Sequence, residues 1–128
     1  LISDLGGPKV PAVGIAFGFD RIVEAVKNLE LLESSKTTAK VLVSIFSPEF
    51  KTESLKVANS LRKAGINTEV YPANDNIGKQ LKYANQMNVP FIIILGEEEK
   101  KVGKVTLKDM ISGKQETLTL KQLLSKLK

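Results

Sequence analysis

Cysteine and histidine are both absent from this chain of 128 residues. Without them the chain has no disulfide framework, no Cys/His metal site, no thiol nucleophile and no imidazole base. Most hydrolytic and redox mechanisms are therefore excluded. A carboxylate-only metal site would have to use the run Glu97 to Glu99, but such a run is more typical of a solvated loop or a helix start. We expect no metal.

Long hydrophobic runs are also missing. The longest strongly apolar run, Phe91 to Leu95, is far too short to span a bilayer, and no basic segment followed by an apolar stretch opens the chain. The 42% hydrophobic and 26% charged content is that of a soluble globular protein with one good core. We expect a cytoplasmic protein with no membrane partner.

Charge is unevenly divided along the chain. Residues 1–35 carry three basic and five acidic residues, whereas residues 36–128 carry sixteen basic and nine acidic residues, a net charge of +7. A positive field attracts a phosphate backbone without specifying sequence, although a lysine-rich soluble surface has the same composition. The polar run 33–40 (ESSKTTAK) is typical of a linker and predicts a boundary between 1–35 and 36–128.

The second part of the chain alternates strand and helix patterns. Strands are predicted at 40–46, 66–71, 91–95, 102–108 and 115–120, with helices between Pro48 and Gly65, from Ile77 to the Val89-Pro90 pair, and over 120–127. The FIIIL run is apolar throughout, as a central strand buried on both faces should be. Right-handed crossovers then predict an α/β fold, a mixed, mainly parallel five-stranded sheet with helices on both faces.

Helical spacing also predicts which side chains face the core. Leu55, Ala58 and Leu61 form the expected buried stripe of the first of these helices, and Gly65 is expected to end it. Ile77, Leu81, Ala84 and Met87 form the stripe of the next helix, and Leu120, Leu123, Leu124 and Leu127 form that of the last.

The stretch Pro11 to Ile22 (PAVGIAFGFDRI) alternates large with small residues. Its period of two predicts a strand with Gly14, Ala16 and Gly18 on one bare face, followed by a helix over 20–32. A bare face admits a flat ligand close to the backbone, and Arg21 supplies a planar cation suited to phosphate. The alternatives are an ordinary strand packed under a helix and a surface arginine.

This stretch resembles motif 3 of the class II aminoacyl-tRNA synthetases, and LGGPKVPAVGIAFGFDRI as a whole resembles the histidyl form. The resemblance implies that residues 1–35 are the C-terminal end of a class II catalytic domain. It implies that Arg21 contacts the ATP phosphates and that Gly18 is part of the floor under the adenine. The parent enzyme would use ATP with Mg²⁺, whereas this fragment alone is expected to be inactive and to bind no cofactor.

Residues 40–128 resemble the anticodon-binding domain shared by the histidyl, threonyl, prolyl and glycyl synthetases. The pieces that carry the resemblance are VLVSIF, NDNIGKQLKYAN, FIIILGEEE and VTLKDMISGKQ. Together with motif 3 they favour the histidyl family. The resemblance implies a parent that ligates histidine to its tRNA with ATP and forms a homodimer, in which residues 36–128 bind the tRNA anticodon.

A protein that reads single-stranded RNA needs amides and carboxylates for base edges, aromatic rings for stacking and cations for the backbone. Around one predicted helix start lie Asn74, Asn76, Lys79, Gln80 and Lys82. Glu97, just after the buried strand, is suited to accept hydrogen bonds from a base. Phe50 and Tyr83 are the stacking candidates. Helix capping by the asparagines and core packing by the aromatic residues are the alternatives.

Two other functions fit parts of the sequence. A synthetase-like regulatory module would bind tRNA as a signal without aminoacylation, but it would not need the motif 3 arginine. A flavodoxin-like domain would bind a small ligand, but SPEFK stands where its glycine-rich phosphate loop would follow the first strand.

Overall fold

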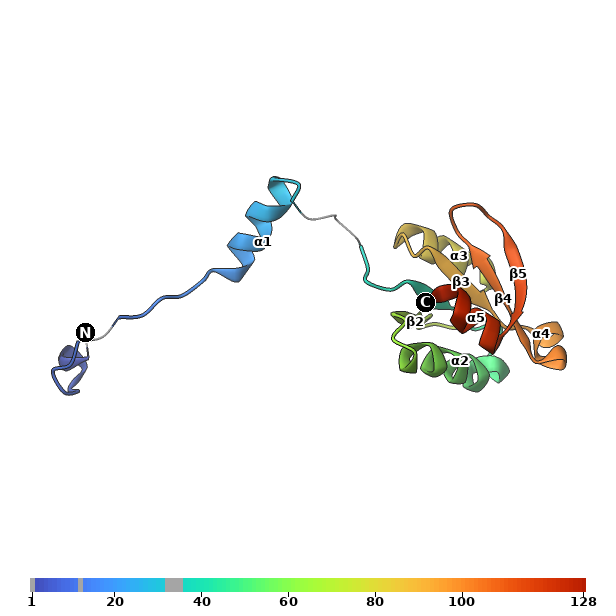
Figure 1. Cartoon of the computed structure of the whole chain (residues 1–128), viewed down its shortest axis with the longest axis horizontal. Coiled ribbons are helices and arrows are strands. Elements are labelled where there is room, and N and C mark those ends of the chain that lie inside the picture. The colour runs from blue at the N-terminus through green and yellow to red at the C-terminus, as the bar shows by residue number, and fades with distance from the viewer. Residues whose placement is uncertain (1, 12, 32–35) are drawn as a thin grey trace. The chain divides into compact units, whose positions relative to one another are not determined.

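The computed structural model describes residues 2–11, 13–31 and 36–128, and the chain divides into two compact units (Figure 1). Leu1–Ser34 is the N-terminal unit and Ser35–Lys128 is the C-terminal unit. Among the described residues, no helix combines the length and apolarity needed to cross a membrane.

The C-terminal unit is built on a five-stranded sheet with the order β2-β1-β3-β4-β5. The strands are β1 (Val41–Val43), β2 (Thr68–Val70), β3 (Phe91–Ile94), β4 (Lys104–Asp109) and β5 (Gln115–Thr119). β1 pairs parallel with β2 and β3, while β4 pairs antiparallel with β3 and β5. The predicted mixed sheet and its central strand are confirmed, although parallel pairing covers half of the strand pairs rather than most.

Helices cover both faces of this sheet, as predicted. They are the 3₁₀ turn η2 (Pro48–Phe50), α2 (Lys51–Lys63), α3 (Ile77–Gln86), α4 (Glu97–Val102) and α5 (Leu120–Leu127). α2 and α5 pack on one face and α3 on the other (Figure 1). The glutamate run at 97–99 begins α4, which places acidic residues at the positive end of the helix dipole.

The two core clusters follow from strand alternation. Val41, Val43 and Ile93 face the α2 and α5 side, while Leu42 and Ile92 face α3. All five side chains are completely buried. The central strands therefore need apolar residues at every position, which explains the unbroken apolar runs in the sequence.

The buried stripe of α2 differs from the predicted one at its first position. Ala58 and Leu61 are fully buried as expected, but Leu55 is 39% exposed and Ser54 is fully buried in its place. Because each helical residue turns by about 100°, residues 54, 58 and 61 share one face and Leu55 lies beside it. The Ser54 hydroxyl is satisfied inside the core, since it donates to the Ser44 carbonyl oxygen at 3.0 Å.

The N-terminal unit contains a short 3₁₀ turn, η1 (Ser3–Leu5), and the helix α1 (Phe19–Asn28). The helix is confirmed, but it ends at Asn28 rather than Leu32, since residues 29–31 are not helical. The strand predicted before it is wrong, because residues 13–18 form no strand. A strand needs a hydrogen-bonded neighbour, and the described residues of this unit include no other strand. Residue 32 and the first linker residues, 33–35, lie outside the described residues.

The contrast between Leu61 and Leu55 gives a direct test of the α2 packing. Leu61→Ala should lower the free energy of unfolding by about 3 kcal/mol, because it leaves a cavity in the core. Leu55→Ala should lower it by less than about 1 kcal/mol, because the leucine is partly solvated. Urea unfolding followed by circular dichroism measures both. Equal losses would contradict the observed helix orientation.

Candidate nucleic-acid interface

Three loops meet at one edge of the sheet, because β1, β2 and β3 run parallel and end on the same side. Residues 44–47 follow β1, residues 71–76 follow β2, and residues 95–96 follow β3. We call these three loops, the first two turns of α3 and Glu97 at the start of α4 the carboxyl edge. Polar and charged side chains of the chain's most distinctive motifs gather here.

Gln80 fastens two of these loops to each other. Its Oε1 accepts a hydrogen bond from the Ile45 N–H at 2.9 Å, and its Nε2 donates to the carbonyl oxygens of Ile45 and Asp75, both at 2.7 Å. The side chain is completely buried. Both amide hydrogens are therefore used inside the protein, which corrects the prediction that Gln80 contacts RNA.

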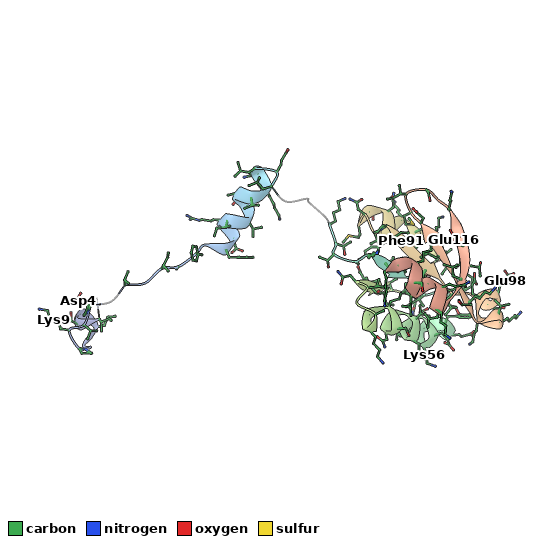
Figure 2. The ribbon with its side chains drawn as sticks, in the orientation of Figure 1. Asp4, Lys9, Lys56, Phe91, Glu98 and Glu116 are labelled. Carbon is green, nitrogen blue, oxygen red and sulfur yellow. The ribbon has the colours of Figure 1, made fainter. Side chains whose placement is uncertain are left out.

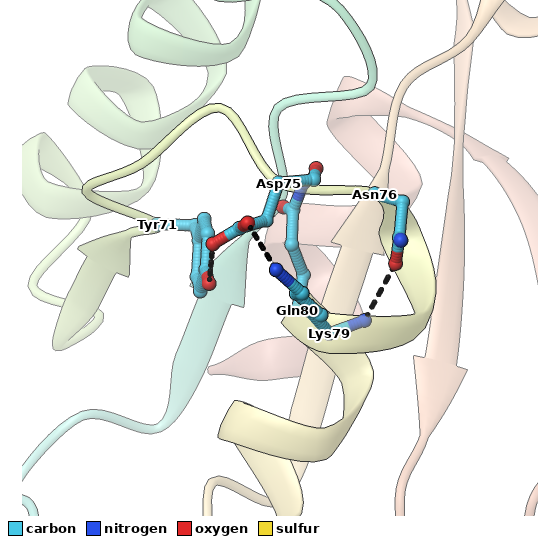
Figure 3. A network of polar contacts seen from close by, with 5 residues as sticks. All are labelled: Tyr71, Asp75, Asn76, Lys79 and Gln80. Carbon is cyan, nitrogen blue, oxygen red and sulfur yellow. Dashed lines mark hydrogen bonds and ion pairs between the residues drawn. The ribbon is translucent and has the colours of Figure 1, made fainter.

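Asp75 links the same loop to an aromatic residue and to a cation (Figure 3). Its Oδ2 accepts from the Tyr71 hydroxyl at 2.8 Å, and its Oδ1 lies 3.0 Å from the Lys79 ammonium. The bond with Lys79, followed by that with Tyr71, holds the pKa of the Asp75 carboxyl below its ordinary value. The carboxylate in turn raises the pKa of the Tyr71 hydroxyl. Tyr71 therefore remains a donor and Asp75 an acceptor at neutral pH.

The remaining predicted contacts of the α3 start are exposed. Asn76 caps α3, because its Oδ1 accepts from the Lys79 N–H at 3.0 Å, and this bond does not use the side-chain NH₂ (Figure 3). Asn74, Lys79 and Lys82 are exposed, and Lys79 and Lys82 share one side of α3 by their spacing of three residues. Glu97 is exposed at the start of α4, so the fold brings the predicted polar residues to one edge.

Glu99 holds the third loop, and sequence reasoning missed it. Its Oε2 accepts from the Gly96 N–H at 3.0 Å, and its Oε1 accepts from the Thr106 hydroxyl at 2.7 Å. Burial raises the pKa of the Glu99 carboxyl, but the hydrogen bonds from Thr106 and from backbone N–H groups lower it by more, so the net pKa lies below its ordinary value of 4.5. The glutamate at the third position of a helix is the available signal, as in a capping box.

Of the two readings left open for the predicted aromatic residues, stacking or core packing, the structure shows packing. Phe50 is 5% exposed and belongs to the core, so it does not present a stacking surface. Tyr83 is partly buried, packs edge-on against Tyr71 and donates to Glu69 at 2.7 Å. Phe46, three residues after the end of β1, is an exposed aromatic residue of this edge, at 51%. Its position just past a buried parallel strand is the sequence signal that points to it.

The opposite edge of the sheet contains an open hollow of about 470 Å³ beside β2. Among its lining residues, Arg62 donates through Nε to the Thr68 carbonyl oxygen, and Asn67 donates to that of Thr38. These groups hold the local backbone in place.

Gly18 and Arg21 lie in the N-terminal unit. Gly18 is the residue before α1, and Arg21 is exposed on its first turn. A Cβ added to Gly18 would meet only the aliphatic part of Arg21, at 3.8 Å. The expected strand under the adenine is not formed, so the described residues of this unit do not enclose a nucleotide.

The chemistry of the carboxyl edge is that of binding. Its exposed groups are the amides of Asn74 and Asn76, the ammonium groups of Lys79 and Lys82, and the carboxylate of Glu97. Further charges surround the unit, for example Lys56 and Glu98, which project from α2 and α4 into solvent (Figure 2). Donors, acceptors and cations on ordered loops suit a polyanion that also displays hydrogen-bonding edges.

Replacing Gln80 tests the connection between the loops. Gln80→Leu should lower the free energy of unfolding by about 3 kcal/mol, because Ile45 and Asp75 lose partners in a dry environment. Gln86→Leu, on the exposed end of the same helix, should change it by less than about 0.5 kcal/mol. Urea unfolding measures both, and a neutral Gln80→Leu variant would contradict the assigned contacts.

The Glu99 contacts predict a pH dependence. Because the folded-state pKa is depressed, the stabilisation is present above pH 4.5 and is lost as the pH falls through the folded-state pKa. Glu99→Gln should therefore cost about 1–2 kcal/mol at pH 7 and progressively less below pH 4.5. Urea unfolding between pH 7 and pH 3 measures this, with Glu98→Gln as the exposed control. A cost independent of pH would show that the carboxylate charge is not involved.

Comparison with known proteins agrees with this geometry. The family model described as "Anticodon binding domain" matches residues 40–128. The histidine–tRNA ligase of Cytophaga hutchinsonii is 38% identical over 128 residues, which cover 99% of this chain and 28% of that protein. The histidine–tRNA ligase of Helicobacter acinonychis is 41% identical over 115 residues, which cover 90% and 26% of the two chains.

Solved structures give the same result. The crystal structure of histidyl-tRNA synthetase from Nostoc sp. PCC 7120 matches with a TM-score of 0.74 and 30% identity, over 85% of this chain and 26% of that one. The chain thus spans little more than a quarter of the length of these relatives. Because the family match covers most of the chain and coincides with the sheet and helices of the C-terminal unit, the chain belongs to the anticodon-binding domain family.

Proposed function

We propose that the C-terminal unit binds the anticodon of histidine tRNA as part of a histidyl-tRNA synthetase. The observation that carries this proposal is the carboxyl edge, where three loops held by the inward-facing side chains of Gln80 and Glu99 present amides, cations and a carboxylate together. The resemblance to histidine–tRNA ligases supports the choice of histidine tRNA over other tRNAs. The parent enzyme would be a cytoplasmic homodimer that ligates histidine to its tRNA.

Each exposed group of the edge has a role in this proposal. The amides of Asn74 and Asn76 donate and accept on the edges of unpaired bases, and Glu97 accepts from the exocyclic amine of a guanine or cytosine. Lys79 and Lys82 lie on the phosphate backbone. The net charge of +7 on residues 36–128 draws the tRNA toward the unit without selecting its sequence.

The N-terminal unit is proposed as the C-terminal end of the catalytic domain. In that domain Arg21 would contact the phosphates of ATP, which the parent uses with Mg²⁺, and Gly18 would lie under the adenine. The described residues do not enclose this nucleotide, so we derive no catalytic step from them. The chain alone is expected to bind tRNA without aminoacylating it.

Binding of the whole chain to histidine tRNA tests the proposal. The chain should bind this tRNA more tightly than the same tRNA with an altered anticodon, by about tenfold or more at moderate salt, because base contacts survive screening of the phosphates. Fluorescence anisotropy at low and moderate salt measures both affinities. Equal, steeply salt-dependent binding would leave only a basic surface and contradict anticodon reading.

Substitution of Lys79 tests the cationic part separately. Lys79→Gln should reduce the slope of log affinity against log salt by about one, because one phosphate contact is lost. The substitution should weaken the binding of the natural and the altered tRNA by the same factor. Lys56→Gln, on α2, is the control of matched charge and should change the slope less. Full retention of affinity by Lys79→Gln at low salt would contradict the proposed phosphate contact.

A further inference from the structure

Phe46 is an exposed aromatic residue on the carboxyl edge, and its ring is held by neighbouring groups. Its ring lies edge-on to the buried ring of Phe50, with centroids 6.2 Å apart and planes at 87°. It also lies against the Gly96 backbone, because a Cβ added there would be 3.8 Å from the Phe46 ring. The ring is therefore supported from two loops while 51% of the residue remains exposed.

The backbone that carries Phe46 is fixed by buried hydrogen bonds. The preceding residue, Ile45, has both its N–H and its carbonyl oxygen bonded to Gln80. Ser44 donates through its N–H to the Ile93 carbonyl oxygen at 2.9 Å, which ties the strand end to β3. Because these contacts hold the loop before any ligand arrives, little conformational entropy remains to be lost on binding.

The Phe50 ring that supports Phe46 is itself held in place by a charged pair. The Lys100 ammonium lies 5.2 Å from the Phe50 centroid and forms an ion pair of 3.2 Å with Glu53. Glu97 begins α4 immediately after Gly96. An exposed flat ring thus lies against the backbone of the residue before Glu97, on a unit with a net charge of +7, and this combination fits a flat heterocycle with amino groups attached to a phosphate chain.

We propose that Phe46 is a stacking surface for one unpaired base of the bound RNA. This inference rests on the proposed function, since it places the anticodon at the carboxyl edge. Stacking on an aromatic ring tolerates any base and does not involve charge. Phe46 therefore contributes affinity, while the amides and Glu97 select the base.

A thermodynamic cycle between protein and RNA tests this assignment. Phe46→Leu keeps an apolar side chain but removes the ring, and it should weaken histidine tRNA binding by about tenfold with an unchanged salt slope. Phe46→Tyr should restore the affinity. The second arm uses tRNAs that carry one abasic nucleotide in the anticodon loop, made for each position in turn. At the position whose base stacks on Phe46, the abasic tRNA should bind the wild-type chain more weakly than intact tRNA does. At that same position, Phe46→Leu should bind the abasic and the intact tRNA equally. Ile111→Ala, an apolar control that is 89% exposed in the β4–β5 turn, should change nothing.

The outcomes are distinguishable from failure of the proposed function. If the wild-type chain does not distinguish the natural anticodon from an altered one, the proposed function fails. If it does distinguish them, and the penalties of Phe46→Leu and of every abasic position add without coupling, the stacking assignment is overturned. The same holds if Phe46→Leu binds as tightly as wild type. Thermal unfolding of each variant before the titration confirms that it is folded at the binding temperature.

Discussion

The amide of Gln80 is the interaction on which the arrangement of the carboxyl edge depends. Parallel strands bring their ends to one side of the sheet, but they do not fix the loops that follow. A single buried side chain uses its acceptor and both of its hydrogens to hold the backbone after β1 and the backbone before α3. A charged or apolar residue in its place would leave some of these backbone groups unpaired in a dry environment.

The edge separates the groups that hold its shape from the groups that face solvent. Gln80 and Glu99 are turned inward and satisfy backbone N–H and carbonyl groups, so they specify loop geometry. The asparagines, lysines and Glu97 are turned outward on those loops. Such a division suits recognition of single-stranded RNA, because flexible bases are best selected by donors and acceptors that are already ordered.

Much of the fold could be predicted because the spacing of apolar residues along the chain indicates which side chains are buried. The span of α5 and the central strand β3 followed from their apolar patterns, and Gly65 and Asn76 followed from the chemistry of helix ends. The N-terminal strand failed because alternation predicts a strand only where a neighbour completes the hydrogen bonds.

The same logic explains the errors in the site. Gln80 was expected to face RNA because its residue type is polar, although it shares a helix face with the buried Ala84 four residues on. Which polar residues turn inward depends on backbone groups of distant loops, and a local pattern does not contain that information. Footprinting by hydrogen–deuterium exchange with and without histidine tRNA tests the central claim most directly. We predict that tRNA protects residues 44–47, 72–79 and 95–99 and leaves the opposite edge, at 65–67 and 88–90, unchanged. Protection confined to that opposite edge would contradict the account.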